Sequence, residues 1–158
     1  MSVTLPKAYF QFLKELKANN HKDWMDAHKA EYKLLEKEFK HFCEDTKNQL
    51  NGFDDIERVK VFRINRDIRF SKNKMPYKTN RGAIFSRSGV HRRGSFYFQM
   101  APGASFAGGG FFKPEPADLL RIRKEFEIDD KEMRDILKDK TFSSIWGDFK
   151  GDSLKTAP

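Results

Sequence analysis

The sequence predicts an α+β fold in a single domain spanning residues 1–158. Apolar residues recur at helical spacing before residue 50, alternate with a period of two in the middle of the chain, and return to a helical pattern after Pro114. A chain of 158 residues with 38% hydrophobic side chains is long enough for one ordinary core. Its 16 Phe, 4 Tyr and 2 Trp residues supply apolar area that a disordered chain lacks.

An N-terminal helical hairpin is the first predicted feature. Its first helix begins with Thr4 as the N-cap residue and Pro6 in the first turn. Its second helix spans about residues 22–50, and Gly52 follows as its stop. We expect the aromatic stripe of the second helix to be buried against a sheet.

A central antiparallel meander of about four strands is predicted to follow the hairpin. The alternation over residues 61–70, which contain no Pro or Gly, predicts a long central or near-central strand. Shorter strands are expected near residues 83–85, 96–100 and 106–112, and C-terminal helices near residues 117–126 and 129–138. The three glycines Gly108–Gly110 match no phosphate-loop motif, so a bulge or close backbone packing is the simpler explanation.

The positive charge is concentrated in one region of the sequence. The net charge is +8, but the segment from Arg58 to Arg93 holds twelve Lys or Arg residues and one acid, Asp67. The rest of the chain is therefore mildly acidic. Such a distribution favours a local site for anions over a uniformly basic surface, although a solvated basic face is the commoner explanation of a charge run.

The candidate site residues lie on the predicted long strand and in the loop after it. Arginine suits phosphate and carboxylate because its planar fork makes two parallel hydrogen bonds, and lysine adds mobile charge. Alternation places Arg66 on the apolar face, where a buried guanidinium needs a partner unless a bulge turns it outward. The candidate ligand-binding residues are Arg63, Asn65, Arg66, Asp67, Arg69, Lys72, Lys74, Tyr77 and Lys78.

Three sequence blocks resemble a known family. FLKELKANNHKDWMDAHKAEY, then FRINRDIRFSKNKMPYKTNRGAIF, then FAGGGFFKPEP followed by LLRIRKEF resemble the family called domain of unknown function 2461, in the same order and over nearly the whole chain. The resemblance implies no particular activity. It also implies that family members continue past the LKTAP near the end of this chain, so that a C-terminal family segment would be missing here.

The favoured function is binding of a small phosphorylated or carboxylated ligand through the basic strand and loop. The alternatives are a nucleic-acid-binding module that uses the same basic region and an interaction domain for an acidic partner. The residues identify no catalytic group, no metal-ligand set, no cofactor, no reaction and no oligomeric state. With no membrane-spanning segment or signal peptide in the sequence, we expect a cytoplasmic protein without a membrane partner.

The position of Asp67 between Arg66 and Arg69 generates a prediction. We expect Asp67→Asn to weaken anion binding, although it removes a negative charge, because the neighbouring arginine loses the carboxylate that orients it. Calorimetric titration of both proteins with inorganic phosphate measures the effect. Equal or tighter binding by the variant would show that only bulk charge matters.

Overall fold

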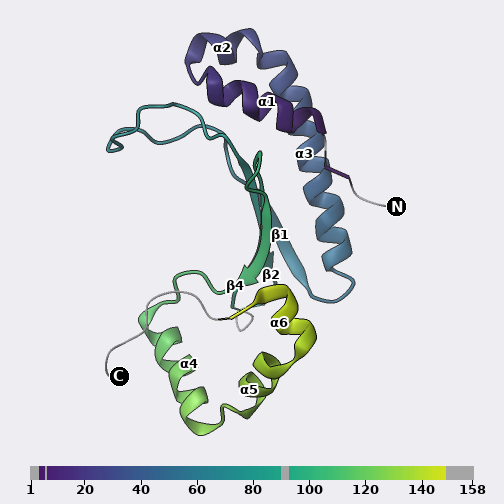
Figure 1. The fold of residues 1–158 in the computed structure, drawn as a ribbon, viewed down its shortest axis with the longest axis vertical. Helices are drawn as coiled ribbons and strands as arrows, with labels where there is room; N and C mark the ends of the chain where they lie inside the picture. Colours follow the sequence, from purple (N-terminus) through teal and green to yellow (C-terminus); the bar gives the residue numbers. More distant parts are fainter. Residues whose placement is uncertain (1–3, 6, 90–92, 149–158) are drawn as a thin grey trace. The chain divides into compact units, whose positions relative to one another are not determined.

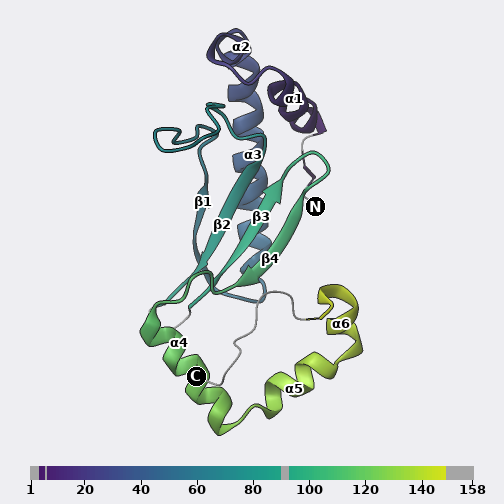
Figure 2. The same ribbon diagram turned by 60° about the vertical axis from the view of Figure 1, so that its left-hand side comes forward.

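The computed structural model describes residues 4–5, 7–89 and 93–148 (Figures 1 and 2). The chain divides into two compact units, Met1–Phe112 and Lys113–Pro158, each of which is described by itself. The single domain over residues 1–158 stays a prediction. The first unit contains α1 (Lys7–Ala18), α2 (Lys22–Ala27), α3 (Lys29–Leu50), β1 (Ile56–Val61), β2 (Arg81–Arg87), β3 (Ser95–Met100) and β4 (Phe106–Gly110).

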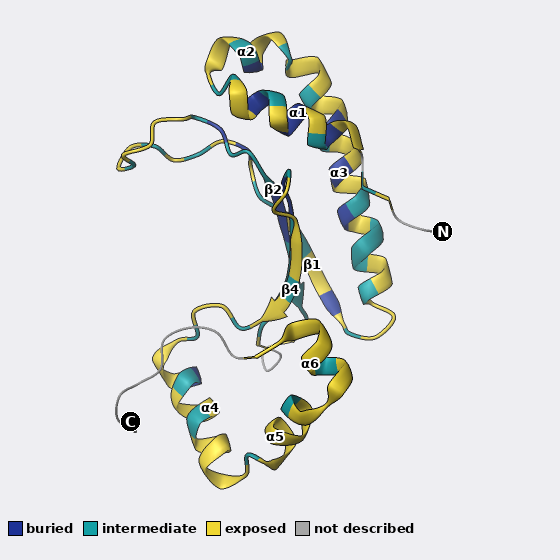
Figure 3. Cartoon of the chain, viewed as in Figure 1, coloured by how far each residue is buried: buried dark blue, intermediate teal, exposed yellow. Residues whose placement is uncertain are grey.

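The four strands form one antiparallel sheet in the order β1-β2-β3-β4, which confirms the predicted meander and the α+β class. The long helix α3 lies along one face of this sheet (Figure 2). Strand alternation divides the side chains between the two faces. Ala83 and Phe85 of β2 are buried toward the helix, whereas Ile84 between them faces the other way and is only half-buried. The dark blue segments of Figure 3 mark the buried positions.

The core of the first unit is aromatic, as the spacing of the N-terminal helices predicts. Phe39 and Phe42 of α3 stack against Phe98 of β3, with ring centroids 6.3 and 5.4 Å apart. Trp24 packs against Phe12 of α1 with ring centroids 5.4 Å apart. These contacts bury the aromatic stripe of the helices against one another and against the sheet.

The predicted helix over residues 22–50 is interrupted at one residue. His28 has φ −103° and ψ 15°, which separates α2 from α3. Its ring stacks on Trp24 at 3.9 Å, and its Nδ1 lies 2.8 Å from the Trp24 carbonyl oxygen. The His28 side chain therefore contacts a carbonyl oxygen of the preceding turn at the point where the helix is interrupted. The spacing of apolar residues in the sequence gives no sign of this contact. Pro6, predicted in the first turn of α1, lies outside the described residues.

The prediction of a long central strand over residues 61–70 is wrong. β1 ends at Val61 and is an edge strand of the sheet. A strand needs a partner that can continue the hydrogen-bond ladder, and the returning chain carries Pro76, which has no N–H to donate. Residues 62–80 instead form a long loop that projects from the sheet (Figure 1). We call this segment the 62–80 loop.

The second unit contains three helices: α4 (Pro116–Ile128), α5 (Lys131–Lys138) and α6 (Lys140–Trp146). The first two confirm the predicted C-terminal helices, and Pro116 opens α4, where its missing N–H costs nothing. α6 has no counterpart among the predicted helices. Asp139 caps it by accepting a hydrogen bond from the Phe142 N–H at 2.7 Å.

A buried ion pair joins the helices to the sheet. The Arg81 side chain is fully buried, and its Nη2 lies 2.6 Å from Oε1 of Glu36 on α3. Tyr9 of α1 donates its hydroxyl proton to the other oxygen of Glu36 at 3.0 Å. Arg81 also donates from Nη1 to the Phe62 carbonyl oxygen, which fixes the start of the 62–80 loop. One buried cation therefore connects α3, β2 and this loop.

The buried pair predicts a large asymmetry between two arginines. Arg81→Met should lower the free energy of unfolding by about 3–5 kcal/mol, because it removes the buried partner of the Glu36 carboxylate and leaves this carboxylate facing the exposed Lys40 ammonium at 3.9 Å. Arg69→Met, which removes an exposed arginine paired with Asp67, should have a much smaller effect, because solvent screens this pair. Urea denaturation of both variants measures the difference.

The double variant Arg81→Met/Glu36→Leu provides a further control. It removes both charges and should recover part of the loss, since no buried carboxylate is then left unpaired. Similar losses for Arg81→Met and Arg69→Met would contradict the structural importance of the buried pair.

Candidate anion-binding site

The two arms of the 62–80 loop pair with each other near the sheet. Phe62 N donates to the Gly82 carbonyl at 2.9 Å, and Lys78 N donates to the Ile64 carbonyl at 2.8 Å. Between these two bonds the outgoing arm advances two residues, from Phe62 to Ile64, whereas the returning arm advances four, from Lys78 to Gly82. The extra residues form an irregularity in the pairing, after which Asn65 and Tyr77 form an isolated β-bridge.

The base of the loop is anchored in the core. The Ile64 and Tyr77 side chains are both buried and belong to the core cluster. Asn20, between α1 and α2, forms two hydrogen bonds with the backbone of Tyr77, both 3.0 Å long. Its side-chain Nδ2 donates to the Tyr77 carbonyl oxygen, and its Oδ1 accepts from the Tyr77 N–H. The positions next to Ile64 and Tyr77, which are Arg63 and Lys78, are therefore held by a rigid scaffold.

The tip of the loop uses several of its polar groups to hold its own shape. Arg66 donates to the Met75 carbonyl at 3.0 Å and to the Ser71 hydroxyl at 3.3 Å. Lys74 donates to the Ile68 carbonyl at 3.1 Å. These bonds close the tip on itself and leave Arg66 and Lys74 fewer donors for a ligand.

Asp67 and Arg69 form a two-pronged pair at the exposed tip. Arg69 donates from Nε to Oδ1 at 3.0 Å and from Nη2 to Oδ2 at 2.7 Å. The hydrogen bonds from Arg69 hold the pKa of Asp67 below its ordinary value, with a smaller contribution from the charge of Arg63. This geometry is what the predicted positioning role of Asp67 requires.

Cations converge at the base of the loop, around the ring of Phe62. The Lys78 ammonium lies 5.7 Å from the centroid of this ring, and the Lys60 ammonium lies 6.0 Å from it. Burial lowers the pKa of Lys78 below its ordinary value of 10.5, and the charges of Arg81 and Arg63 lower it further. Positive charge from Lys60, Lys78 and Arg63 therefore accumulates at the base of the loop.

Arg63 and Lys72 are the loop cations with the most freedom to bind a ligand. Both side chains are exposed, and within the described ranges neither makes a hydrogen bond or an ion pair. Arg63 lies at the anchored base, close enough to Lys78 to influence its pKa. Lys72 follows Ser71, whose hydroxyl accepts a hydrogen bond from Arg66 at the tip of the loop.

The sheet face opposite α3 carries a row of aromatic rings next to these cations. The rings of Phe62 and Tyr97 lie 6.4 Å apart between centroids, and those of Tyr97 and Phe106 lie 5.4 Å apart. A Cβ atom on Gly82 would come within 2.7 Å of the Tyr97 hydroxyl oxygen, so the tyrosine ring lies directly over this glycine. Gly108, by contrast, borders open space on the outer strand β4.

A hollow of about 750 Å³ opens on this face. Its walls are mainly apolar and aromatic, and Lys78 is the charged residue among them. Ligand sites of this size combine apolar walls with a few polar groups that orient the ligand. Its lining includes Phe62, Lys78, Ile84, Tyr97, Phe106 and Gly108.

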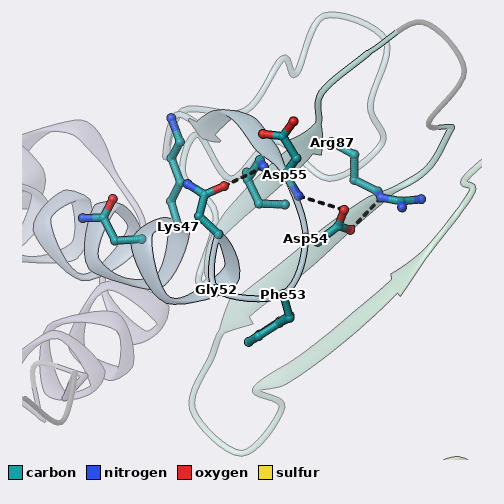
Figure 4. A pocket seen from close by; sticks show the side chains of 9 residues that line it. Lys47, Gly52, Phe53, Asp54, Asp55 and Arg87 are labelled. Carbon is teal, nitrogen blue, oxygen red and sulfur yellow. Dashed lines mark hydrogen bonds and ion pairs between the residues drawn. The ribbon is translucent and has the colours of Figure 1, made fainter.

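A second hollow lies at the turn between α3 and β1 (Figure 4). Its polar groups bond to one another: Arg87 pairs with Asp54 at 2.7 Å, and Asn51 accepts from the Ile56 N–H at 2.7 Å. Lys47 donates to the Glu57 carbonyl at 2.9 Å. These contacts stabilise the turn, so the hollow on the sheet face, with its unneutralised cations, is the better candidate site.

The structure separates the nine predicted site residues into groups. Arg63 and Lys78 come together at the base, whereas Arg69 and Lys72 belong to the projecting part. The residues expected on the predicted long strand instead lie in the loop; they are Arg63, Asn65, Asp67 and Arg69. Arg66 is half-buried and bonded within the loop, and Tyr77 contributes its side chain to the core.

Four residues of the region were not among the predicted set: Lys60, Phe62, Tyr97 and Arg81. A signal for Arg81 was present, because it shares the strand parity of Ala83 and Phe85 and so falls on the covered face. The register Lys60–Ile84–Tyr97, by contrast, depends on strand pairing between distant segments.

Two candidate chemistries find no support in the described residues. Cys43 is buried, and burial raises the pKa of its thiol to about 12, which disfavours the reactive thiolate. Among residues 4–5, 7–89 and 93–148, no group of three or more His, Cys, Asp or Glu side chains is arranged to hold a metal ion. No described helix has the length and hydropathy needed to cross a membrane.

Comparison with known proteins identifies one family. A model of the family described as "Conserved hypothetical protein (DUF2461)" matches residues 8–158. No curated protein and no solved structure matches the chain.

The lowered pKa of Lys78 predicts proton uptake on anion binding. A bound anion favours the ammonium form and raises this pKa, so binding in alkaline solution should be accompanied by proton uptake at Lys78. Phosphate titrations in two buffers of different ionisation enthalpy measure the uptake. Lys78→Met should abolish it, and an undiminished uptake in that variant would contradict the assignment to Lys78.

Proposed function

The chain belongs to the family of conserved hypothetical proteins called domain of unknown function 2461, and from its own geometry we propose that it binds a small phosphorylated or carboxylated anion. The observation that carries the proposal is the convergence of Lys60 and Lys78 around the ring of Phe62, with Arg63 close enough to lower the pKa of Lys78. Bringing like charges together is unfavourable, and a bound anion removes the cost.

Each cation has a distinct role in the proposed site. Arg63 offers a guanidinium fork for two parallel hydrogen bonds to an anion, and it stands on the anchored base of the loop. Lys60 on β1 and Lys78 on the returning arm of the 62–80 loop each add a positive charge. Arg81 does not touch the ligand. It holds the Phe62 backbone in place through its bond to the carbonyl.

A nucleic-acid-binding module is the second candidate, and the aromatic row on the open face favours it. Rings on an exposed sheet stack bases, and flanking lysines follow the phosphate backbone. The compact cluster argues for the small anion instead, because the hollow concentrates its charge at one end rather than along a groove. Docking of an acidic partner and a cytoplasmic location stay predictions, and no reaction is proposed.

Substitution of matched loop cations tests the proposal. Arg63→Ala and Lys78→Ala should each weaken binding of inorganic phosphate or citrate about tenfold or more, because each removes a charged contact. Lys72→Ala removes an exposed cation of the same loop and should change affinity less than about twofold. Calorimetric titration at constant ionic strength gives the affinities, and circular dichroism confirms that the variants fold.

The salt dependence separates the two candidates. A compact site should lose little affinity as salt rises, whereas a protein that tracks a phosphate backbone loses orders of magnitude on an oligonucleotide. Equal losses for Arg63→Ala, Lys78→Ala and Lys72→Ala, together with a steep salt slope on a thymidine decamer, would replace the small-anion site by nucleic-acid binding.

A further inference from the structure

The hollow on the open sheet face has lysine ammonium groups near one end and aromatic rings beside a glycine at the other. Lys60, Ile84, Tyr97 and Gly108 lie opposite one another in register across β1, β2, β3 and β4. Three strand spacings separate the first from the last, about 14 Å in all. The ammonium groups of Lys60 and Lys78 lie at the β1 end, and the glycine lies at the β4 end.

The β4 end is suited to a planar ring. Tyr97 and Phe106 present aromatic surfaces with centroids 5.4 Å apart, and Phe106 is half-exposed. Because Gly108 has no side chain, the strand next to these rings leaves its backbone uncovered, and nothing lies within 4 Å of the position of a Cβ atom. A planar ring could therefore stack on an aromatic side chain and lie close to the backbone of β4.

Building on the proposed function, we infer that the anion carries a planar ring and that the site binds a nucleoside phosphate. The phosphate lies between Lys60, Lys78 and Arg63, and the base lies in the hollow beside Tyr97 and Phe106. Charge complementarity determines the direction, since Lys78, the charged residue of the lining, and Lys60 lie beside Phe62 at the β1 end. The apolar walls between the two ends, with Ile84 at the centre, cover the body of the ligand.

A three-member probe series separates the base from the phosphate. Inorganic phosphate, ribose 5-phosphate and adenosine 5′-monophosphate add a sugar and then a base to the same anion. The full-length chain should bind the nucleotide about tenfold or more tightly than ribose 5-phosphate, because stacking on an aromatic side chain adds to the phosphate contacts. Isothermal titration calorimetry measures all three affinities.

Two substitutions on the same strand provide matched variants. Gly108→Val adds a β-branched side chain, which a strand accommodates well, and it projects into the hollow. It should reduce nucleotide binding to the level of ribose 5-phosphate and leave ribose 5-phosphate binding unchanged. Ala107→Val, at an exposed position that does not line the hollow, should alter neither.

The outcomes distinguish failure of this inference from failure of the proposed function. If no phosphate binds, the proposed anion site is wrong and the inference falls with it. If ribose 5-phosphate and the nucleotide bind equally in the wild type, or if Gly108→Val weakens neither, the anion site stands and the ring site is wrong. If a thymidine decamer binds far more tightly than the nucleotide, with a steep salt slope, the open face serves single-stranded nucleic acid.

Discussion

The Arg81 guanidinium is enclosed by protein, and its charge must be balanced there because water does not reach it. Glu36 supplies the balancing charge from α3, Tyr9 donates a hydrogen bond to Glu36 from α1, and the Phe62 carbonyl oxygen accepts a hydrogen bond from Arg81. The ring of Phe39 covers the guanidinium at 5.7 Å. The positions of α3, of β2 and of the first residues of the 62–80 loop therefore depend on this one interaction.

The same interaction shapes the candidate site on the other side of the sheet. By fixing the Phe62 backbone, Arg81 fixes the ring around which Lys60 and Lys78 gather. Its charge also acts on Lys78, whose pKa is already lowered by burial. The buried pair thus belongs to the core, while its effects extend to the surface where an anion would bind.

The predicted strand in the basic region was wrong. Alternation over residues 61–70 is real in the sequence, yet Ile64 is buried in the core while Phe70 is almost fully exposed at the tip of the loop. Arg66 was the arginine expected to raise a burial problem, and Arg81 is the one that is buried. Periodicity describes the pattern of side chains within one segment, whereas a strand also requires a partner strand that continues its hydrogen bonds. Pro76 on the returning arm has no N–H and cannot supply the next one.

The sequence by itself determined the α+β class, the order of the elements and the concentration of cations between Arg58 and Arg93, because these follow from composition and short-range period. Only the tertiary structure decided which cations are neutralised, as Arg81 is by Glu36, and which face of the sheet stays uncovered beside Tyr97. Glu36 and Arg81 are 45 residues apart in the sequence. Lys60 and Tyr97 lie on the same sheet face because each pairs with Ile84, on either side of β2. Burial and charge pairing depend on such distant neighbours, and no local pattern encodes them.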